Sequence, residues 1–230
     1  MIEIQNLKKS FQGRLVLDIP SLILEPGIRY AIIGANGSGK STLLKLIAGV
    51  IPPDEGSIHI PLQEREALGY MPQRVYAFRQ SVLKNVMMAL PSTQKNIARE
   101  AAMEALKQVG MDHMAHLPGN RLSGGESQRM AFARMLVRPR PFLFLDEPTS
   151  AADIKGNDMV EEALLSYHAA SGCGMVMATH SLAQASRLAQ ELLYMDHGIL
   201  VERGPTKEVL HHPKSPQLQE FLAHWHLKEG

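Results

Sequence analysis

The stretch GANGSGKS, residues 34–41, matches the pattern G-x-x-x-x-G-K-[ST] at every fixed position. Residues 30–33 before it form a short apolar run, and a run with helical spacing begins at Ser41 and stops at Gly49. A buried strand, a glycine-rich turn and a helix, in this order, are the context in which this pattern binds phosphate. The alternative is a strand-to-helix turn that matches the pattern by chance.

The residue types of this stretch suit a nucleoside triphosphate. Glycines let the backbone curl so that successive N–H groups point at phosphate oxygens, and the following helix adds the positive end of its dipole. Lys40 would reach the β- and γ-phosphates, and the hydroxyl of Ser41 would bind Mg²⁺. The nucleotide-binding residues expected in this loop are Gly34, Asn36, Gly37, Ser38, Gly39, Lys40, Ser41 and Thr42.

An acidic pair follows a second apolar run far downstream. Residues 142–145 are all apolar, and they end in Asp146 and Glu147. A carboxylate at the carboxyl end of a strand in an open α/β sheet faces the ligand crevice. Asp146 therefore suits Mg²⁺ coordination, and Glu147 suits the general base that polarises an attacking water. Taken alone, such a pair is more often a helix cap or a solvated turn, and it gains weight only beside the phosphate loop.

Apolar periodicity predicts two kinds of strand. Apolar and polar side chains alternate over residues 2–4, 15–19 and 57–60, which is typical of strands with one buried face. Residues 142–145 and 174–178 do not alternate, which is typical of parallel strands that are covered on both faces. We expect an antiparallel β portion at the N-terminus and a mainly parallel sheet in the rest of the core.

Two segments between these strands have helical spacing, residues 97–110 and residues 126–137. We interpret the chain as one α/β domain whose core covers about residues 1–73 and 141–230, with a mostly helical lobe inserted at about residues 74–140. The predicted sheet is mixed and mainly parallel.

Composition excludes several classes of protein. The 24 Lys and Arg against 23 Asp and Glu give a net charge of +1, which argues against a chain that binds nucleic acid by bulk charge. The longest strictly apolar run, residues 86–90, is far shorter than the about 20 residues that a membrane span needs. The N-terminus has no pattern of a signal peptide, and the single cysteine, Cys173, fits a reducing compartment. These features predict an intracellular protein that does not cross a bilayer.

The stretch LSGGE, residues 122–126, admits two interpretations. Ser123 and Glu126 fit a capping box at the start of a helix. Capping does not explain Gly124 and Gly125, because each glycine costs about 1 kcal/mol inside a helix. The pair makes sense where the backbone must come close to an anion at a helix N-terminus.

Taken in order along nearly the whole chain, these segments resemble the ATP-binding subunits of ABC transporters. That family has a phosphate loop, a glutamine at a lobe junction, the signature L-S-G-G-[QE], an apolar strand ending in Asp-Glu, and a histidine after the next strand. Here the five features are residues 34–42, Gln73, residues 122–126, the pair at 146–147 and His180. The resemblance implies a P-loop NTPase core that hydrolyses ATP with the help of Mg²⁺.

The resemblance also implies roles for single residues. Phe11 stands where the family has an aromatic ring that stacks on adenine; the alternative is an apolar residue at a strand end. Gln73 would contact Mg²⁺ or the attacking water, and His180 would hydrogen-bond the γ-phosphate. Asp153 closes a segment S-A-A-D where the family usually has S-A-L-D. The expected catalytic residues are Lys40, Gln73, Glu147 and His180; the metal ligands are Ser41, Gln73 and Asp146; the further nucleotide contacts are Phe11, Ser123, Gly124, Gly125, Glu126 and Asp153.

The partners are implied by the same resemblance. Subunits of this family pair head to tail around two ATP molecules, as homodimers or with a related ATPase subunit, and the signature of one closes over the γ-phosphate held by the other. They dock near their helical lobe on separate transmembrane permease subunits, at the cytoplasmic face of the cell membrane, and importers add a substrate-binding protein. No nucleic acid partner is expected. Residues 73–82 resemble importer subunits, with oxyanion importers of the tungstate type nearest. The alternative is a soluble assembly factor that carries the same cassette.

Overall fold

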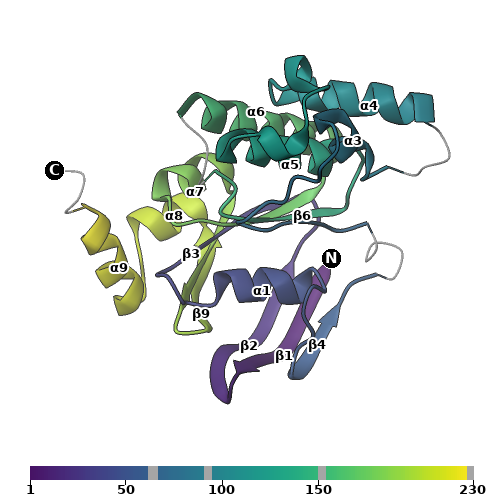
Figure 1. Ribbon diagram of the computed structural model, residues 1–230. Helices are drawn as coiled ribbons and strands as arrows, with labels where there is room; N and C mark the ends of the chain where they lie inside the picture. Colours follow the sequence, from purple (N-terminus) through teal and green to yellow (C-terminus); the bar gives the residue numbers. More distant parts are fainter. Residues whose placement is uncertain (62–66, 91–94, 150–153, 227–230) are drawn as a thin grey trace.

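The computed structural model describes residues 1–61, 67–90, 95–149 and 154–226, and it contains two β-sheets with helices packed between and above them (Figure 1). The smaller sheet is antiparallel and has the order β2-β1-β4. Its strands are β1 (Ile2–Phe11), β2 (Arg14–Leu24) and β4 (Glu55–His59). Every second residue at the start of β1 is buried, because successive side chains of a strand point to opposite faces. The predicted N-terminal antiparallel portion is confirmed.

The larger sheet has six strands in the order β5-β6-β7-β3-β8-β9. They are β3 (Arg29–Ile33), β5 (Gly69–Met71), β6 (Phe142–Asp146), β7 (Gly174–Ala178), β8 (Glu191–Asp196) and β9 (Ile199–Pro205). All neighbouring strands run parallel except β8 and β9, which are antiparallel. The prediction of a mixed, mainly parallel sheet is therefore confirmed.

One helix, α1 (Lys40–Ile47), lies between the two sheets (Figure 1). Its buried leucines share a core cluster with side chains of the small sheet and with Phe142 and Phe144 of β6. The two phenylalanine rings stack with centroids 6.1 Å apart. The sequence pattern predicts this helix from Ser41, one residue later than the structure has it. The packing of α1 fixes the loop that precedes it against the edge of the large sheet.

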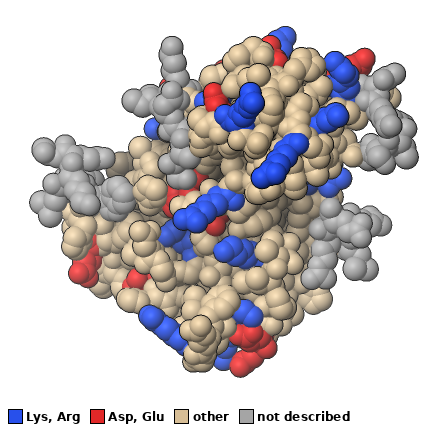
Figure 2. Space-filling model, viewed as in Figure 1, with Lys and Arg blue, Asp and Glu red and all other residues tan. Residues whose placement is uncertain are grey.

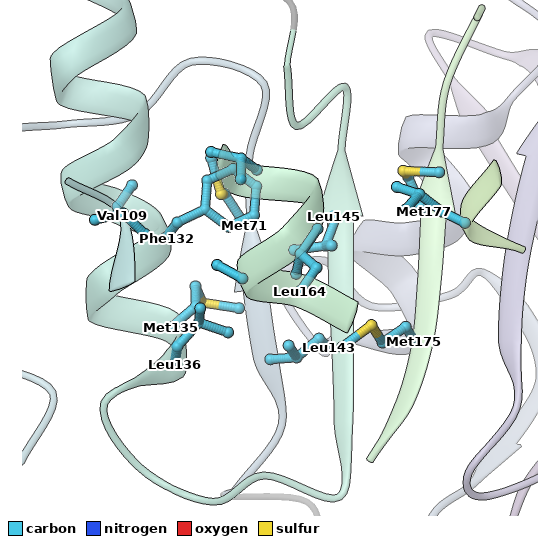
Figure 3. Packing of buried hydrophobic residues seen from close by; sticks show 14 of the residues in the cluster. Met71, Val109, Phe132, Met135, Leu136, Leu143, Leu145, Leu164, Met175 and Met177 are labelled. Carbon is cyan, nitrogen blue, oxygen red and sulfur yellow. The ribbon is translucent and has the colours of Figure 1, made fainter. Parts of the chain in front are cut away.

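The opposite face of the large sheet is covered by α5 (Gly124–Leu136), α6 (Ile154–Ser171) and α7 (Leu182–Leu188). Figure 3 shows the contact: Leu143 and Leu145 of β6 lie in one cluster with side chains of α5 and α6, among them Phe132 and Leu164. β6 is therefore buried on both faces, which explains why its sequence does not alternate.

A group of helices lies between β5 and β6 in the sequence. It contains α3 (Val82–Met87), α4 (Lys95–Gln108), the 3₁₀ turns at Asp112–Met114 and Gly119–Arg121, and α5. The structure starts α4 and α5 two residues before the predicted positions. An inserted helical portion is thus present, while its exact limits at residues 74 and 140 stay a prediction. Two further helices follow β9, α8 (Thr206–His211) and α9 (Pro216–His226).

Figure 2 shows charges of both signs on the displayed face, separated by uncharged residues. Among the residues that the structure describes, no helix combines the length and the apolar character that crossing a membrane requires.

Candidate active site

The predicted phosphate-loop, metal-binding and catalytic residues gather at the carboxyl edge of the large sheet, because parallel strands end on the same side. The loop between β3 and α1 lies there, and Gln73, Glu147 and His180 follow the ends of β5, β6 and β7 by one or two residues. A cavity of about 180 Å³ opens at this edge. It is lined by Val16, Asn36, Gly37, Ser38, Gly39, Lys40, Ser41, Thr42, Gln73 and Glu147. The loop, the glutamine and the acidic strand end therefore meet in one place.

Gly34 fixes the path of the loop. Its φ of 148° is open to glycine, and a Cβ there would overlap the carbonyl oxygen of Met195 and approach Ser38 Oγ at 2.8 Å. Gly39 has a φ of 100° and precedes the first residue of α1. The hydroxyl of Ser38 is buried and, among the described residues, has no hydrogen-bond partner. A buried donor without a partner inside such a loop fits a site for ligand oxygens.

Lys40 lies folded into this loop. Its Nζ donates to the carbonyl oxygens of Gly34 and Ala35 at 2.8 and 3.0 Å, and only 7% of the residue is exposed. Burial lowers the pKa of the ammonium group, and the negative charges of Glu147 and Asp146 oppose this effect. The ammonium group is thus held by two backbone carbonyl oxygens of the phosphate loop.

Ser41 and Asp146 are direct neighbours although they stand 105 residues apart in the sequence. Ser41 Oγ donates to Asp146 Oδ1 at 2.8 Å. Asp146 is 3% exposed. Burial of the Tyr70 hydroxyl, together with the negative charge of Asp146, raises the pKa of Tyr70 to about 12. A hydroxyl oxygen beside a carboxylate is the hard donor set that Mg²⁺ prefers, so these residues fit the predicted metal.

Glu147 is held in an unusual conformation beside His180. Its φ is 51°, in the left-handed region, which costs a non-glycine residue about 1 to 3 kcal/mol. Its N–H donates to the carbonyl oxygen of Ala178 at 2.9 Å, and its Oε2 lies 2.8 Å from His180 Nδ1. The carboxylate is mostly buried, whereas the histidine is more than half exposed. Backbone strain of this kind is typical of residues with a function.

The signature segment forms the capping box that its sequence predicts. Ser123 Oγ accepts from the N–H of Glu126 at 3.3 Å, and Glu126 Oε2 accepts from the N–H of Ser123 at 2.7 Å. This backbone hydrogen bond lowers the pKa of Glu126. The two glycines form the first turn of α5, and Ser123 and Gly124 are exposed. None of residues 123–126 lines the phosphate-loop cavity.

The remaining predicted nucleotide contacts are Phe11 and Asp153. Phe11 ends β1 and is exposed, with Lys9 Nζ at 5.6 Å from the centroid of its ring, and it is not among the residues that line the cavity. Asp153 lies outside the described residues. The roles of both residues stay predictions.

The sequence alone does not predict a role at the site for two residues that the structure places there. Val16 of β2 lines the cavity. Gln128 of α5 donates from Nε2 to the backbone carbonyl oxygen of Glu147 at 3.2 Å. Gln128 could have been found from the sequence, because a long polar side chain on the apolar face of an amphipathic helix is buried and needs a hydrogen-bond partner.

The comparisons agree with this geometry. Residues 17–150, more than half of the chain, match the family model "ABC transporter". The arginine transport ATP-binding protein ArtM of Bacillus subtilis (strain 168) is 36% identical over 239 residues, which covers 96% of this chain and 98% of ArtM. The tungstate uptake system ATP-binding protein TupC of Peptoclostridium acidaminophilum is 34% identical, and the match covers 86% of this chain and 95% of TupC.

A solved structure has the same architecture. It is a dimeric ATP-binding cassette in a post-hydrolysis state, bound to ADP and Pi, with a TM-score of 0.81 and 26% sequence identity. The match covers 90% of this chain and 99% of that one. By motif order, fold and similarity, the chain belongs to the ABC transporter family and is an ATP-binding, ATP-hydrolysing subunit of it.

Proposed function

We propose that this subunit hydrolyses ATP to energise an importer whose permease is made of separate membrane subunits. The observation that carries the proposal is the meeting of Lys40, the Ser41–Asp146 pair and the Glu147–His180 pair at one edge of the sheet. ATPases with a phosphate loop use such a set of residues to transfer a phosphoryl group to water.

The residues divide the chemistry among them. The backbone N–H groups of the loop and Lys40 Nζ bind the β- and γ-phosphates. Ser41, Asp146 and Gln73 would hold Mg²⁺, which neutralises phosphate charge when it is bound. Glu147 accepts the proton of the attacking water as the oxygen bonds to the γ-phosphorus, and the bond to the β–γ bridging oxygen breaks to release ADP and phosphate. His180, whose Nδ1 lies 2.8 Å from Glu147 Oε2, would contact a γ-phosphate oxygen through its other ring nitrogen.

We propose further that two subunits pair head to tail around two ATP molecules. Support comes from the exposure of Ser123 and Gly124 and from their absence from the cavity of their own chain. The amino end of α5, with its positive dipole end, suits the γ-phosphate held by a neighbouring subunit. The dimeric cassette with ADP and Pi supports the same arrangement. Phe11 would stack on the adenine, and Asp153 would lie near the paired interface.

The remaining proposals concern location and cargo. The helical lobe at about residues 74–140 would dock on the permease at the cytoplasmic face of the cell membrane, and a substrate-binding protein would deliver the cargo. An oxyanion such as tungstate is the proposed cargo, which the relative TupC supports. ArtM, named for arginine, is similarly related, so cargo needs its own test.

The test is purification of the subunit from native membranes with its bound partners, followed by ATPase assays in proteoliposomes. A multi-span permease that copurifies, and turnover stimulated by tungstate with the binding protein but not by arginine, would support the proposal. Turnover stimulated by arginine and not by tungstate would identify arginine as the cargo in place of the oxyanion. A subunit that brings no membrane protein with it would favour the soluble assembly factor.

A further inference from the structure

The peptide group after Glu147 is held by a side chain from a different element. The carbonyl oxygen of Glu147 accepts a hydrogen bond from Gln128 Nε2 of α5 at 3.2 Å. On the other side of the residue, the N–H of Glu147 donates to Ala178 at the end of β7 at 2.9 Å. Both backbone polar groups of Glu147 are therefore tied, one to the sheet and one to the helix that begins with the signature.

Local sequence does not favour the conformation that these contacts hold. Glu147 precedes Pro148, and a residue before proline prefers extended backbone. Yet its φ is 51°, in the left-handed region. Because the local preference opposes the observed conformation, tertiary contacts must maintain it. Within the described part of the chain, the hydrogen bond from Gln128 holds the carbonyl oxygen of the peptide group between residues 147 and 148.

Burial makes this contact specific. Gln128 is 2% exposed, so its amide cannot exchange the bond with Glu147 for one with bulk water. An amide N–H left unpaired in such a place is costly, which favours a single arrangement of the side chain. Gln128 thus contacts the backbone that carries the side chain of Glu147. The carboxylate of that side chain lines the cavity and lies beside His180.

We propose that Gln128 is a positioning residue for the general base: its hydrogen bond to the carbonyl oxygen of Glu147 keeps that residue in the left-handed conformation and aims its carboxylate at the attacking water. Gln128 touches neither nucleotide nor water in this account. The proposal rests on the proposed role of Glu147.

The chain offers a matched control in Gln184 of α7. This glutamine is also 2% exposed, and its Nε2 donates to Thr149 Oγ1 at 2.9 Å and to Glu161 Oε1 at 3.1 Å. It contacts the same loop two residues beyond Glu147, but through a side chain and not through the backbone of the base. Gln128→Met and Gln184→Met therefore remove equally buried amides of equal size, and only the first releases the peptide of Glu147.

The experiment measures kcat, KM and MgATP affinity for wild type, Gln128→Met, Gln184→Met and Glu147→Gln in the reconstituted transporter, with melting temperatures as a check on folding. Displacement of a catalytic group by about 1 Å costs on the order of 100-fold in rate. We expect Gln128→Met to lower kcat by about 10- to 100-fold with KM and MgATP affinity unchanged, and Gln184→Met to keep the wild-type kcat. In the Glu147→Gln background, Gln128→Met should cause no further loss, since both changes act on one group.

The outcomes separate the two proposals. A wild-type kcat in Gln128→Met, together with an inactive Glu147→Gln, overturns the positioning role and leaves the proposed function standing. Normal turnover in Glu147→Gln overturns the proposed base itself. Equal losses in both methionine variants, or a parallel loss of MgATP affinity, would assign Gln128 to general packing and overturn the inference. If Gln128→Met does not fold, Gln128→Asn keeps a buried amide that is one methylene too short and carries the same expectation.

Discussion

His180 Nδ1 lies 2.8 Å from Glu147 Oε2, although the two residues follow different strands of the large sheet. β6 and β7 are parallel neighbours with Asp146 paired to Ala178, so the residues that follow them emerge side by side. The group proposed to take a proton and the group proposed to contact the γ-phosphate are thus joined directly.

Replacement of Lys40 by Ala should weaken MgATP binding. The ammonium group would otherwise exchange the carbonyl oxygens of Gly34 and Ala35 for phosphate oxygens, and a hydrogen bond to a charged group contributes about 1.5 to 3 kcal/mol. We expect a loss of roughly 10- to 100-fold in affinity, measured by calorimetry. Lys45→Ala, near the end of the same helix, is the control and should bind as wild type. Unchanged affinity in Lys40→Ala would refute the placement of the site.

Gly34→Ala should destabilise the fold more than Gly37→Ala. Both glycines have positive φ, but a Cβ at Gly34 would overlap the carbonyl oxygen of Met195, whereas a Cβ at Gly37 would have no neighbour within 4 Å among the described residues. Strain alone predicts a loss of about 1 to 2 kcal/mol for Gly37→Ala. Strain with overpacking predicts about 2 to 5 kcal/mol for Gly34→Ala. Urea unfolding measures both; equal losses would mean that the loop is free to move away from Met195.

Gly124→Asp should separate nucleotide binding from hydrolysis. Gly124 is the first residue of α5 and is exposed, and a carboxylate in the first turn of a helix is favourable, so the fold should not suffer. In a head-to-tail pair the same carboxylate would repel the neighbour's γ-phosphate. We expect normal MgATP affinity of the monomer with hydrolysis nearly abolished. Loss of affinity in the isolated monomer would mean that the segment serves its own chain, against the paired arrangement.

Glu126→Ala should cost stability in a pH-dependent way. The hydrogen bond from the N–H of Ser123 lowers the pKa of Glu126 in the folded state below its ordinary value of 4.5. Its contribution is therefore complete above pH 4.5 and is lost as the pH falls through the folded pKa. We expect wild type to exceed Glu126→Ala by about 0.3 to 1 kcal/mol at neutral pH, with the gap closing in acid. A gap that stays constant between pH 7 and pH 3 in urea unfolding would contradict the role of the charge.

The phosphate loop, α1, β6 and the capping box could be predicted because each is encoded in a contiguous segment. The common edge of the sheet could be predicted as well, since apolar strands that precede Ser41 and Asp146 imply it. The apolar pattern predicts that α5 begins at Glu126, but the structure begins the helix at Gly124. The first N–H groups of a helix have no partner within the helix, so two glycines in the first turn leave its hydrogen bonds intact.

The conformation of Glu147 could not be predicted. Pro148 favours an extended residue before it, and the observed φ of 51° is stabilised by contacts with Ala178 and Gln128. These residues lie on a different strand and on a helix, and no periodicity links them to Glu147. The same holds for Val16, whose place at the cavity depends on how the small sheet packs on α1.

Glu147 is proposed to take the proton of the attacking water. Glu147→Gln keeps the size of the side chain and its contacts but removes the charge that accepts a proton. The most direct measurement is single-turnover hydrolysis of MgATP by this variant, with its assembly state followed by size-exclusion chromatography. We predict a chemical step slower by about 100- to 10,000-fold, intact MgATP binding, and an ATP-dependent dimer that accumulates. Near-normal turnover by Glu147→Gln would contradict the account.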